Sequence, residues 1–262
     1  MVSMIIDCCA VCAPGPARPE NQDNLYINGV FRENFSDNTP FRYSDRVSNR
    51  GLYAVADGMG TEKHGALAAL IAVQAMDTIR LSDLTGRSMA CYLIGRNAVI
   101  CDMMKENGEI CIGSTFAGLA INGGNACAVN IGNSRIYLLR GRRLTQLSHD
   151  HTTVLQEPDT GVAAEGPGYR HDEGRRLTQH LGVIPGEFDI EPHIVSFPLV
   201  DNDLLLLCSD GLTDMLDDSC ISRVLETSAS MDRKVETLYE SALRNGGKDD
   251  VTILLLKVKK EV

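Results

Sequence analysis

The sequence predicts an α+β fold in which antiparallel strands and helices pack in layers. Apolar runs joined by tight turns follow one another between residues 114 and 147, and such runs indicate an antiparallel sheet. Helical stretches come in two pairs, one before and one after these strands, which favours a layered α+β arrangement. The chain of 262 residues has no linker and no internal repeat, so we expect one domain over residues 1–262.

The first half of the chain is expected to form strands and then a helix pair. Strands are expected at residues 3–13, 25–27 and 51–56, and helices at 66–80 and about 88–107. The first strand is stopped by Pro14-Gly15-Pro16. The second helix has apolar residues near 3.6-residue spacing and a stop signal at Asn107-Gly108. Residues 31–50 are polar and aperiodic, so we interpret them as a surface loop or an excursion of the sheet.

The second half is expected to form a hairpin-rich sheet and the second helix pair. Strands are expected at residues 114–121, 126–131, 136–139, 192–197, 204–208 and from 251, and helices after Gly211 and at about 231–244. Asn122-Gly123-Gly124-Asn125 is a good hairpin turn, and Asn245-Gly246-Gly247 ends the last helix. Residues 148–176 are rich in Gly, Pro, His and charge, which is typical of a functional or mobile loop.

Composition narrows the class of protein. The formal net charge of −10 argues against nucleic acid or an anionic membrane surface as a partner. No apolar stretch is long enough to span a bilayer, and residues 1–7 lack the features of a secretory signal, so we expect a cytoplasmic protein. An odd count of nine cysteines then favours reduced, buried thiols, and the lone Cys9-x-x-Cys12 pair does not predict a zinc site.

Three acidic junctions stand beside apolar runs. Two of the apolar runs end in an Asp-Gly pair, at Asp57 and at Asp210. The last apolar run begins just after an acidic pair that contains Asp249. Such runs are typical of strands buried on both faces, and an ionised carboxylate at their rim is costly unless something pairs with it. No Lys or Arg is obviously dedicated to these carboxylates. Oxygen ligands of this kind predict a hard divalent cation, Mg²⁺ or Mn²⁺.

The order of short motifs gives a resemblance to a known family. The motifs are Arg18-Pro19-Glu20-Asn21-Gln22-Asp23, Val55-Ala56-Asp57-Gly58-Met59-Gly60, Gly113-Ser114-Thr115, Gly132-Asn133-Ser134-Arg135, Leu177-Thr178-Gln179-His180-Leu181-Gly182, Cys208-Ser209-Asp210-Gly211-Leu212 and Lys248-Asp249-Asp250-Val251-Thr252. Their sequence along nearly the whole chain resembles the metal-dependent protein phosphatase 2C family in its compact bacterial form. The resemblance implies a four-layer αββα sandwich of two facing antiparallel sheets flanked by helix pairs, with a metal site at one end.

The resemblance also implies roles for individual residues. The implied ligands of two Mn²⁺ or Mg²⁺ ions are Asp23, directly or through water, Asp57, the carbonyl of Gly58, Asp210 and Asp249. Arg18 would hold the substrate phosphate. Asn133 stands where the family typically has Asp and would bind a third ion more weakly, since its amide oxygen carries no charge. Met59 and Gln22 also differ from residues found in some members, and the general acid is left unassigned.

Alternatives stay open for several of these residues. Asp57 and Asp210 could form ordinary Asx turns, and Arg18 could be a surface cation. Either Asp249 or Asp250 could be the ligand, although motif position favours Asp249. Adjacent residues on a strand point to opposite faces, so the His149-Asp150-His151 triplet is not expected to bind a metal. We expect Asp150 to cap a short helix there instead.

These inferences lead to a functional hypothesis. We expect hydrolysis of phosphoserine and phosphothreonine in proteins by a metal-activated water, without a nucleophilic Ser or Cys. The expected partners are phosphorylated proteins, opposing a serine/threonine kinase, and the expected state is a monomer. The alternative is a phosphoprotein-binding or regulatory pseudophosphatase of the same fold, to which the altered Asn133 and Gln22 give some weight. Residues 148–176 could act as a flap that selects substrates.

Overall fold

The structure is a computed structural model that describes residues 4–16, 18–34, 38–47, 50–60, 62–81, 86–108, 112–154, 175–184, 186 and 189–260. In the first half the elements are β1 (Met4–Ala13), β2 (Asp23–Ile27), β3 (Val30–Phe31), β4 (Phe41–Val47), β5 (Arg50–Met59), α1 (Glu62–Val73), a 3₁₀ turn (Met76–Thr78) and α2 (Arg87–Asn107). In the second half they are β6 (Gly113–Ser114), β7 (Phe116–Asn122), β8 (Asn125–Ile131), β9 (Arg135–Arg140), β10 (Arg143–Gln146), β11 (Thr152–Val154), β12 (Arg175–Leu177), β13 (His193–Pro198), β14 (Leu204–Cys208), α3 (Asp210–Thr213), α4 (Asp218–Leu225), α5 (Met231–Arg244) and β15 (Val251–Lys260).

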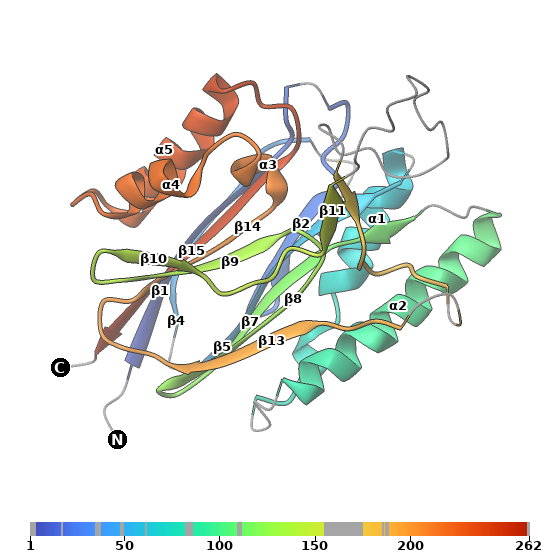
Figure 1. Ribbon diagram of the computed structural model, residues 1–262, viewed down its shortest axis with the longest axis horizontal. Coiled ribbons are helices and arrows are strands. Elements are labelled where there is room, and N and C mark those ends of the chain that lie inside the picture. The colour runs from blue at the N-terminus through green and yellow to red at the C-terminus, as the bar shows by residue number, and fades with distance from the viewer. Residues whose placement is uncertain are drawn as a thin grey trace.

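Two antiparallel sheets form the centre of the molecule (Figure 1). One has the strand order β10-β9-β14-β15-β1-β4, and the other has the order β13-β8-β7-β5-β2-β3 with β6 paired to β5. β15 lies in the middle of the first sheet, between β14 and β1, and its register with β1 runs from Met4 opposite Lys260 to Ala13 opposite Val251. β11 and β12 make a separate two-stranded ribbon.

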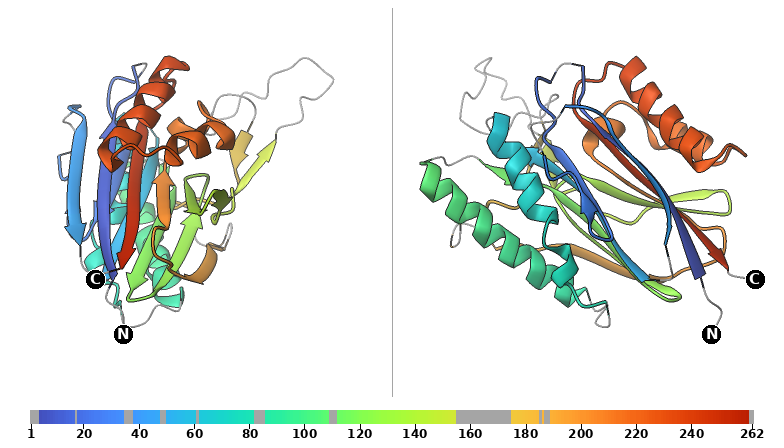
Figure 2. Two further views of the ribbon diagram at one scale, coloured as in Figure 1. Left: turned by 90° about the vertical axis from the view of Figure 1, so that its left-hand side faces the viewer. Right: turned by 180° about the vertical axis from the view of Figure 1, so that it is seen from behind.

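Helices cover the outer face of each sheet, as the view from behind shows (Figure 2). α1 and α2 pack on the sheet that contains β5, β7 and β8, and their shared apolar cluster includes Leu93, Ile100 and Phe116. α4 and α5 pack on β1, β14 and β15 through a second cluster. A third apolar cluster fills the space between the two sheets. These three apolar layers separate four layers of secondary structure, so the predicted αββα sandwich is confirmed.

Most of the expected elements are present, with informative differences. Residues 31–50 contain β4, which pairs with β1 from Ile6 to Cys12 and so extends the first sheet at its edge. The helix expected over 66–80 begins earlier, at Glu62, and ends at Val73. β5 continues through Asp57 and Gly58 to Met59, because β6 pairs with its end. Asp57 therefore lies inside a strand and not in the turn that an Asp-Gly pair could form.

In the part of the chain that the structure describes, most cysteines are buried thiols outside any disulfide, as the sequence predicts, whereas Cys91 is exposed and Cys220 half-buried. The buried ones are Cys8, Cys9, Cys12, Cys101, Cys127 and Cys208. Burial raises the pKa of the Cys12 thiol to about 11, so it stays protonated near neutral pH. Cys12 accepts a hydrogen bond from Asn21, and its Sγ lies 3.1 Å from Thr252 Oγ1, which places it in the packing between the sheets. Cys9-x-x-Cys12 is thus a pair of strand residues.

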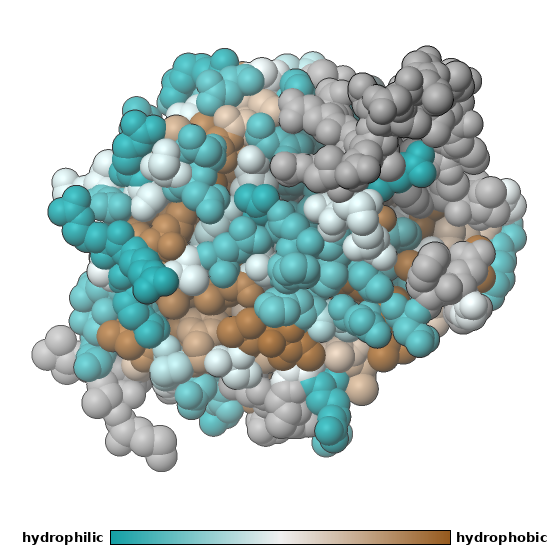
Figure 3. All heavy atoms as spheres, viewed as in Figure 1, coloured by the Kyte–Doolittle hydropathy of each residue, from teal (hydrophilic) through white to brown (hydrophobic). Residues whose placement is uncertain are grey.

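The face of the molecule seen in Figure 3 is mostly polar, with some apolar exposure over β13. Ile194 of this edge strand and nearby Val200 are 40% and 44% exposed. Individual exposed apolar residues are ordinary in soluble domains. Among the helices in the described ranges, none has the length and apolar character that a bilayer crossing requires.

Candidate active site

Asp23 and Asp57 lie directly opposite each other on neighbouring antiparallel strands, β2 and β5. Directly opposed residues of such a pair present their side chains on the same face of the sheet. This face looks toward the other sheet, because Ser209 and Thr252, from the ends of β14 and β15, both contact Asp23. The two carboxyl groups are almost fully buried, with residue exposures of 3% and 6%. Two distant sequence motifs are therefore joined by strand register.

The carboxylate of Asp23 is held by two hydroxyl groups from the facing sheet. Ser209 Oγ and Thr252 Oγ1 each donate a hydrogen bond of 2.7 Å to Asp23 Oδ2. Burial raises the pKa of Asp23 well above its ordinary value, and the nearby charges of Asp250 and Asp249 raise it further. The hydroxyl donors oppose this rise because they stabilise the charged form. Asp23 is thus fixed in position at the junction of the two sheets.

Asp57 lies against Asp210, the first residue of the short helix α3. Their side chains are in hydrogen-bond contact, and Asp210 is 2% exposed. Burial raises the pKa of Asp57 well above its ordinary value, and the charges of Asp210, Asp23 and Asp249 raise it further. Two buried carboxyl groups in contact require a shared proton or a cation to offset their repulsion. The backbone N–H of Asp57 donates to Thr115 Oγ1 at 3.0 Å, which anchors this end of β5.

Asn133 contacts the same carboxylate from the turn between β8 and β9. Its Nδ2 donates to Asp210 Oδ2 at 2.7 Å. Its other polar atom, Oδ1, is buried and has no hydrogen-bond partner among the described residues. An unpartnered buried amide oxygen is costly, since it has lost its water without a replacement. Asn133 therefore brings an open oxygen ligand to the acidic cluster.

Asp249 and Arg18 form an ion pair at the rim of the cluster. Arg18 Nη2 lies 2.6 Å from Asp249 Oδ2, and the side chain of Arg18 is 38% exposed. Burial alone would lower the pKa of Arg18, but the hydrogen bond and charge of Asp249, with the charges of Asp250 and Asp57, raise it. The guanidinium group is thus the cation that faces the acidic cluster from the loop after β1.

Asp250 has a different set of partners from its neighbour Asp249. Its two carboxylate oxygens accept the backbone N–H groups of Gly15, at 3.0 Å, and Gln22, at 2.7 Å. Burial raises the pKa of Asp250 to about 6, although these two hydrogen bonds act in the opposite direction. Asp250 therefore ties the loop that carries Arg18 to the start of β15. Asp249 is left facing that arginine.

The glycines after Asp57 and Asp210 are required by close backbone packing. A Cβ atom built on Gly58 would lie 2.0 Å from the carbonyl oxygen of Gly65 in α1. One built on Gly211 would lie 2.0 Å from the carbonyl oxygen of Asp250. Both glycines have φ angles outside the left-handed region, so turn geometry is not their reason. Each Asp-Gly pair thus serves to bring a second segment against the acidic residue.

The sequence identifies most of this cluster but not its hydroxyl residues. Thr252 and Ser209 lie within the quoted motifs, yet nothing in a single sequence shows that they reach Asp23 across the sandwich. Thr115 and Ser134 form a further buried pair, with their oxygens 2.7 Å apart. Signals for these positions existed only as small polar residues next to each acidic junction.

The acidic residues converge without forming a closed set of charged ligands. Over the described ranges, no three His, Cys, Asp or Glu side chains are grouped so as to hold one ion. In the structure Asp249 is turned to Arg18, and Asp23 accepts hydrogen bonds from Ser209 and Thr252. The other atoms of the cluster that could coordinate a metal ion are oxygens of Asp57, Asp210 and Asn133. Such a set suits hard cations in chemical type.

The expectation that Asp150 caps a helix was wrong. Asp150 instead accepts several hydrogen bonds from the guanidinium of Arg135, with Nη2 2.6 Å from Oδ2, and β11 follows it. The two flanking imidazoles, of His149 and His151, contact each other edge to face with ring centroids 5.4 Å apart. The triplet therefore fixes the chain at the start of residues 155–174, which lie outside the described ranges.

Comparisons with known proteins agree with this arrangement. The family profile described as Stage II sporulation protein E (SpoIIE) matches residues 48–259. The serine/threonine phosphatase Stp of Listeria welshimeri is 30% identical over 256 residues, covering 93% of this chain and 92% of the relative. The protein phosphatase PhpP of Streptococcus pneumoniae is 30% identical over 253 residues, covering 94% of this chain and 95% of the relative.

A solved structure supports the same fold. The catalytic domain of the serine/threonine protein phosphatase PstP, in complex with two manganese ions, is similar with a TM-score of 0.73 and 24% identity. The similarity covers 98% of this chain and 100% of that domain. Because the family profile spans most of the chain and both relatives are 30% identical over nearly their full length, the chain belongs to the SpoIIE/protein phosphatase 2C family of serine/threonine phosphatases.

Proposed function

We propose that this protein hydrolyses phosphoserine and phosphothreonine in other proteins at the cluster of Asp23, Asp57, Asp210 and Asp249. The observation that carries the proposal is the contact between Asp57 and Asp210, with Asp23 opposite Asp57 in the sheet. A cluster of buried carboxyl groups is destabilising in a protein unless it serves to bind positive charge. Relatives named serine/threonine phosphatase and protein phosphatase support the substrate class.

We propose further that the cluster holds two Mn²⁺ or Mg²⁺ ions. Asp57, Asp210 and Asp249, with the carbonyl of Gly58, would be the main ligands, and Asp23 would contribute directly or through water. The fit is supported by the all-oxygen donors and by the unpartnered buried Oδ1 of Asn133, which suits a weaker third ion. Bound there, these ions would supply the positive charge that attracts a phosphate group and activates water as its nucleophile.

The chain's own residues prepare the site for this chemistry. Ser209 and Thr252 hold the Asp23 carboxylate in one orientation, and Asn133 holds Asp210. Both carboxylate oxygens of Asp250 already accept backbone N–H groups, from Gly15 and Gln22. This favours Asp249 over Asp250 as the metal ligand. Arg18 stands at the exposed rim, where its guanidinium could turn from Asp249 to two oxygens of an incoming phosphate.

The test is phosphate release by the purified protein from p-nitrophenyl phosphate and from a phosphothreonine peptide. We expect turnover with Mn²⁺, none after chelation, and none in Asp57→Asn. Asp102→Asn is the matched control, because Asp102 is an exposed residue of α2 that pairs with the equally exposed Lys105. Turnover that survives chelation or Asp57→Asn would contradict the proposed mechanism. Metal and phosphopeptide binding without turnover would instead support the regulatory pseudophosphatase.

Several features of the proposal extend beyond the chemistry. We propose one domain over residues 1–262, a monomer in the cytoplasm, and substrates shared with a serine/threonine kinase. Light scattering behind a sizing column tests the monomer.

We also propose that residues 148–176 form a substrate-selecting flap, rooted in the β11–β12 ribbon and the Arg135–Asp150 pair. Deleting residues 157–172 should slow release from the phosphopeptide more than from p-nitrophenyl phosphate.

A further inference from the structure

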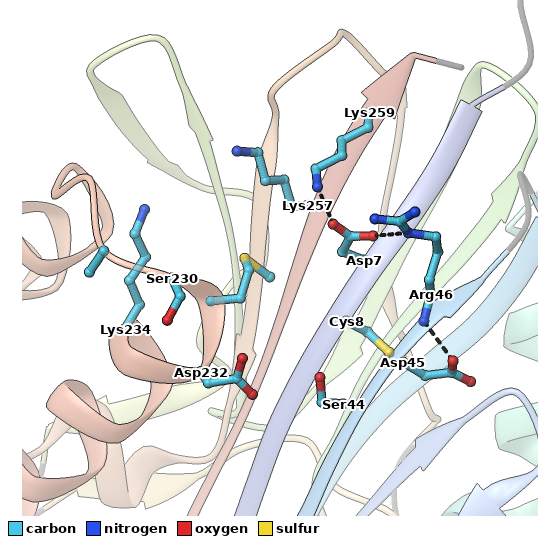
Figure 4. Close-up of a pocket in the computed structure, with 12 residues that line it drawn as sticks. Asp7, Cys8, Ser44, Asp45, Arg46, Ser230, Asp232, Lys234, Lys257 and Lys259 are labelled. Carbon is cyan, nitrogen blue, oxygen red and sulfur yellow. Dashed lines mark hydrogen bonds and ion pairs between the residues drawn. The ribbon is translucent and has the colours of Figure 1, made fainter. Parts of the chain in front are cut away.

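A cavity of about 440 Å³ lies between the start of α5 and strands β1, β4 and β15 (Figure 4). It is separate from the acidic cluster, which lies where β15 begins. Lys257 lines the cavity and lies on β15, the strand that begins at Val251. At the usual rise per residue, these two residues are roughly 20 Å apart along the strand. The volume is in the range of pockets that accept small molecules.

One wall of the cavity has its charges satisfied. Asp7 of β1 forms ion pairs with two cations, Arg46 of β4 and Lys259 of β15, and Arg46 Nε lies 2.9 Å from Asp7 Oδ1. Asp45 accepts hydrogen bonds from the hydroxyl of Tyr43 and the backbone N–H of Arg46. The side chains of this wall are therefore held in place and close one side of the cavity.

Two further lysines line the cavity, Lys234 on α5 and Lys257 on β15 next to the strand position of Lys259. Lys234 of α5 is 8% exposed, and its Nζ donates to the carbonyl oxygen of Leu225 at 2.6 Å. Lys257 of β15 is half-buried and lies directly opposite Asp7 in the register of β1 and β15, but the ion pairs of Asp7 over the described ranges are with Arg46 and Lys259. Burial lowers the pKa of Lys234, and the positive charge of Lys257 lowers it further. An anion placed between the two ammonium groups would relieve this repulsion.

The cavity also has polar groups that would orient such an anion. Ser230, the N-cap of α5, accepts the backbone N–H of Arg233 through its hydroxyl oxygen, which leaves its O–H as a donor. In Figure 4, Lys234 and Lys257 extend toward one end of the cavity, and Asp232 lies at the other. Asp232 accepts a weak hydrogen bond from Cys9 Sγ at 3.2 Å. A ligand with an anionic group at one end and a hydrogen-bond donor at the other would match the two lysines and Asp232.

We propose that this cavity binds a small phosphate monoester whose phosphate lies between Lys234 and Lys257 and whose hydroxyl or amino group faces Asp232. Phosphate is favoured because it carries two negative charges and several acceptor oxygens, which suit two ammonium groups. The site is independent of the acidic cluster, so the inference does not rest on the proposed function.

The test is binding to protein freed of metal by chelation and dialysis, in which the ester is not consumed by metal-dependent turnover. Phosphoethanolamine and inorganic phosphate are the probes, titrated by calorimetry and by amide chemical shifts. We expect shifts at residues 229–234 and 257–259, with phosphoethanolamine bound more tightly than inorganic phosphate. Equal affinity for the two probes would overturn the assigned role of Asp232 and hence the monoester.

Variants locate the site. Lys257→Gln should weaken binding about tenfold, a loss of about 1.4 kcal/mol. Lys260→Gln is the matched control, because Lys260 is exposed at the end of the same strand and does not line the cavity. Arg18→Ala should leave the shifts at residues 229–234 and 257–259 unchanged, which separates this cavity from the proposed phosphatase site. Equal affinity of Lys257→Gln and wild type, or shifts confined to residues near Arg18 and Asp249, would overturn the proposal.

Discussion

Arg18 and Asp249 form an ion pair of 2.6 Å at the rim of a buried acidic cluster. The guanidinium group lies where it neutralises a proposed metal ligand, and it is also the proposed phosphate-binding group. Both roles cannot use the same Nη2 atom in the same geometry. Metal binding at Asp249 should therefore release Arg18 for the substrate.

Arg18→Ala should separate these two roles. We expect kcat/KM for the phosphopeptide to fall about 10- to 100-fold, because a charge-assisted contact to phosphate is lost. In the absence of phosphate, Mn²⁺ should bind about two- to fivefold more tightly, since the competing cation at Asp249 is gone. Calorimetry measures the second effect, and Arg142→Ala, whose side chain is 90% exposed, is the control. Weaker Mn²⁺ binding in Arg18→Ala would contradict the competition.

Gly58→Ala should destabilise the fold strongly. The added methyl group would lie 2.0 Å from the carbonyl oxygen of Gly65, so β5 and α1 would have to separate. We expect a loss of about 3 kcal/mol or more in the free energy of unfolding. Gly95→Ala, in α2, meets nothing within 4 Å and should stabilise by about 0.5–1 kcal/mol. Urea titrations measure both, and equal effects of the two substitutions would count against the packing argument.

Asp150→Ala should leave Arg135 as a half-buried cation with a weakened set of partners. The two side chains are 19% and 22% exposed, so this ion pair is intermediate between a surface pair and a buried pair. We therefore expect a loss of about 2 kcal/mol in the free energy of unfolding. Asp102→Ala removes an exposed ion pair with Lys105 and should cost less than about 0.5 kcal/mol. Thermal unfolding compares the pair. A change in Asp150→Ala no larger than in the control would show that the contact is not structural.

Asn133→Asp should change metal binding and stability in opposite directions. In the metal-free protein the substitution replaces a donor to Asp210 with a second carboxylate, so the melting temperature should fall. With Mn²⁺ in excess, the added charge should tighten the weakest binding step about tenfold. Calorimetry measures the Mn²⁺ titration, and thermal unfolding measures the melting temperature. An unchanged titration would argue against an ion at Asn133.

Cys208→Ala should leave turnover intact. Cys208 precedes Ser209 and Asp210, but it is fully buried, and burial raises its pKa to about 12. The thiolate that a cysteine-dependent phosphatase needs is therefore absent near neutral pH. We expect kcat for p-nitrophenyl phosphate within about twofold of wild type, with a modest loss of stability from the smaller side chain. Loss of turnover in a variant that still folds would reopen a thiol mechanism.

Local patterns predicted the elements well where their start and stop signals were strong. α5 begins and ends at the predicted Met231 and Arg244, because Ser230 caps its first turn and Asn245 ends it. β4 was left open within residues 31–50, since its residues alternate weakly and its pairing with β1 is a long-range property. The acidic residues were identified from sequence, whereas their partners Ser209 and Thr252 depend on how two sheets face each other. The ion pair of Arg135 with Asp150 was not predicted either, because it depends on how the loop before β11 folds back on β9.

The place of β15 beside β1 has a consequence for how the molecule is made. Residue 4 is paired with residue 260, so the central contact of one sheet joins the two extremes of the described chain. Closing so large a loop costs conformational entropy before any apolar contact repays it, and proteins with such distant pairings fold slowly. A nascent chain leaving the ribosome would hold β1 and β14 with open hydrogen-bonding edges until β15 emerged. Chaperone dependence during synthesis should therefore be greatest for this sheet.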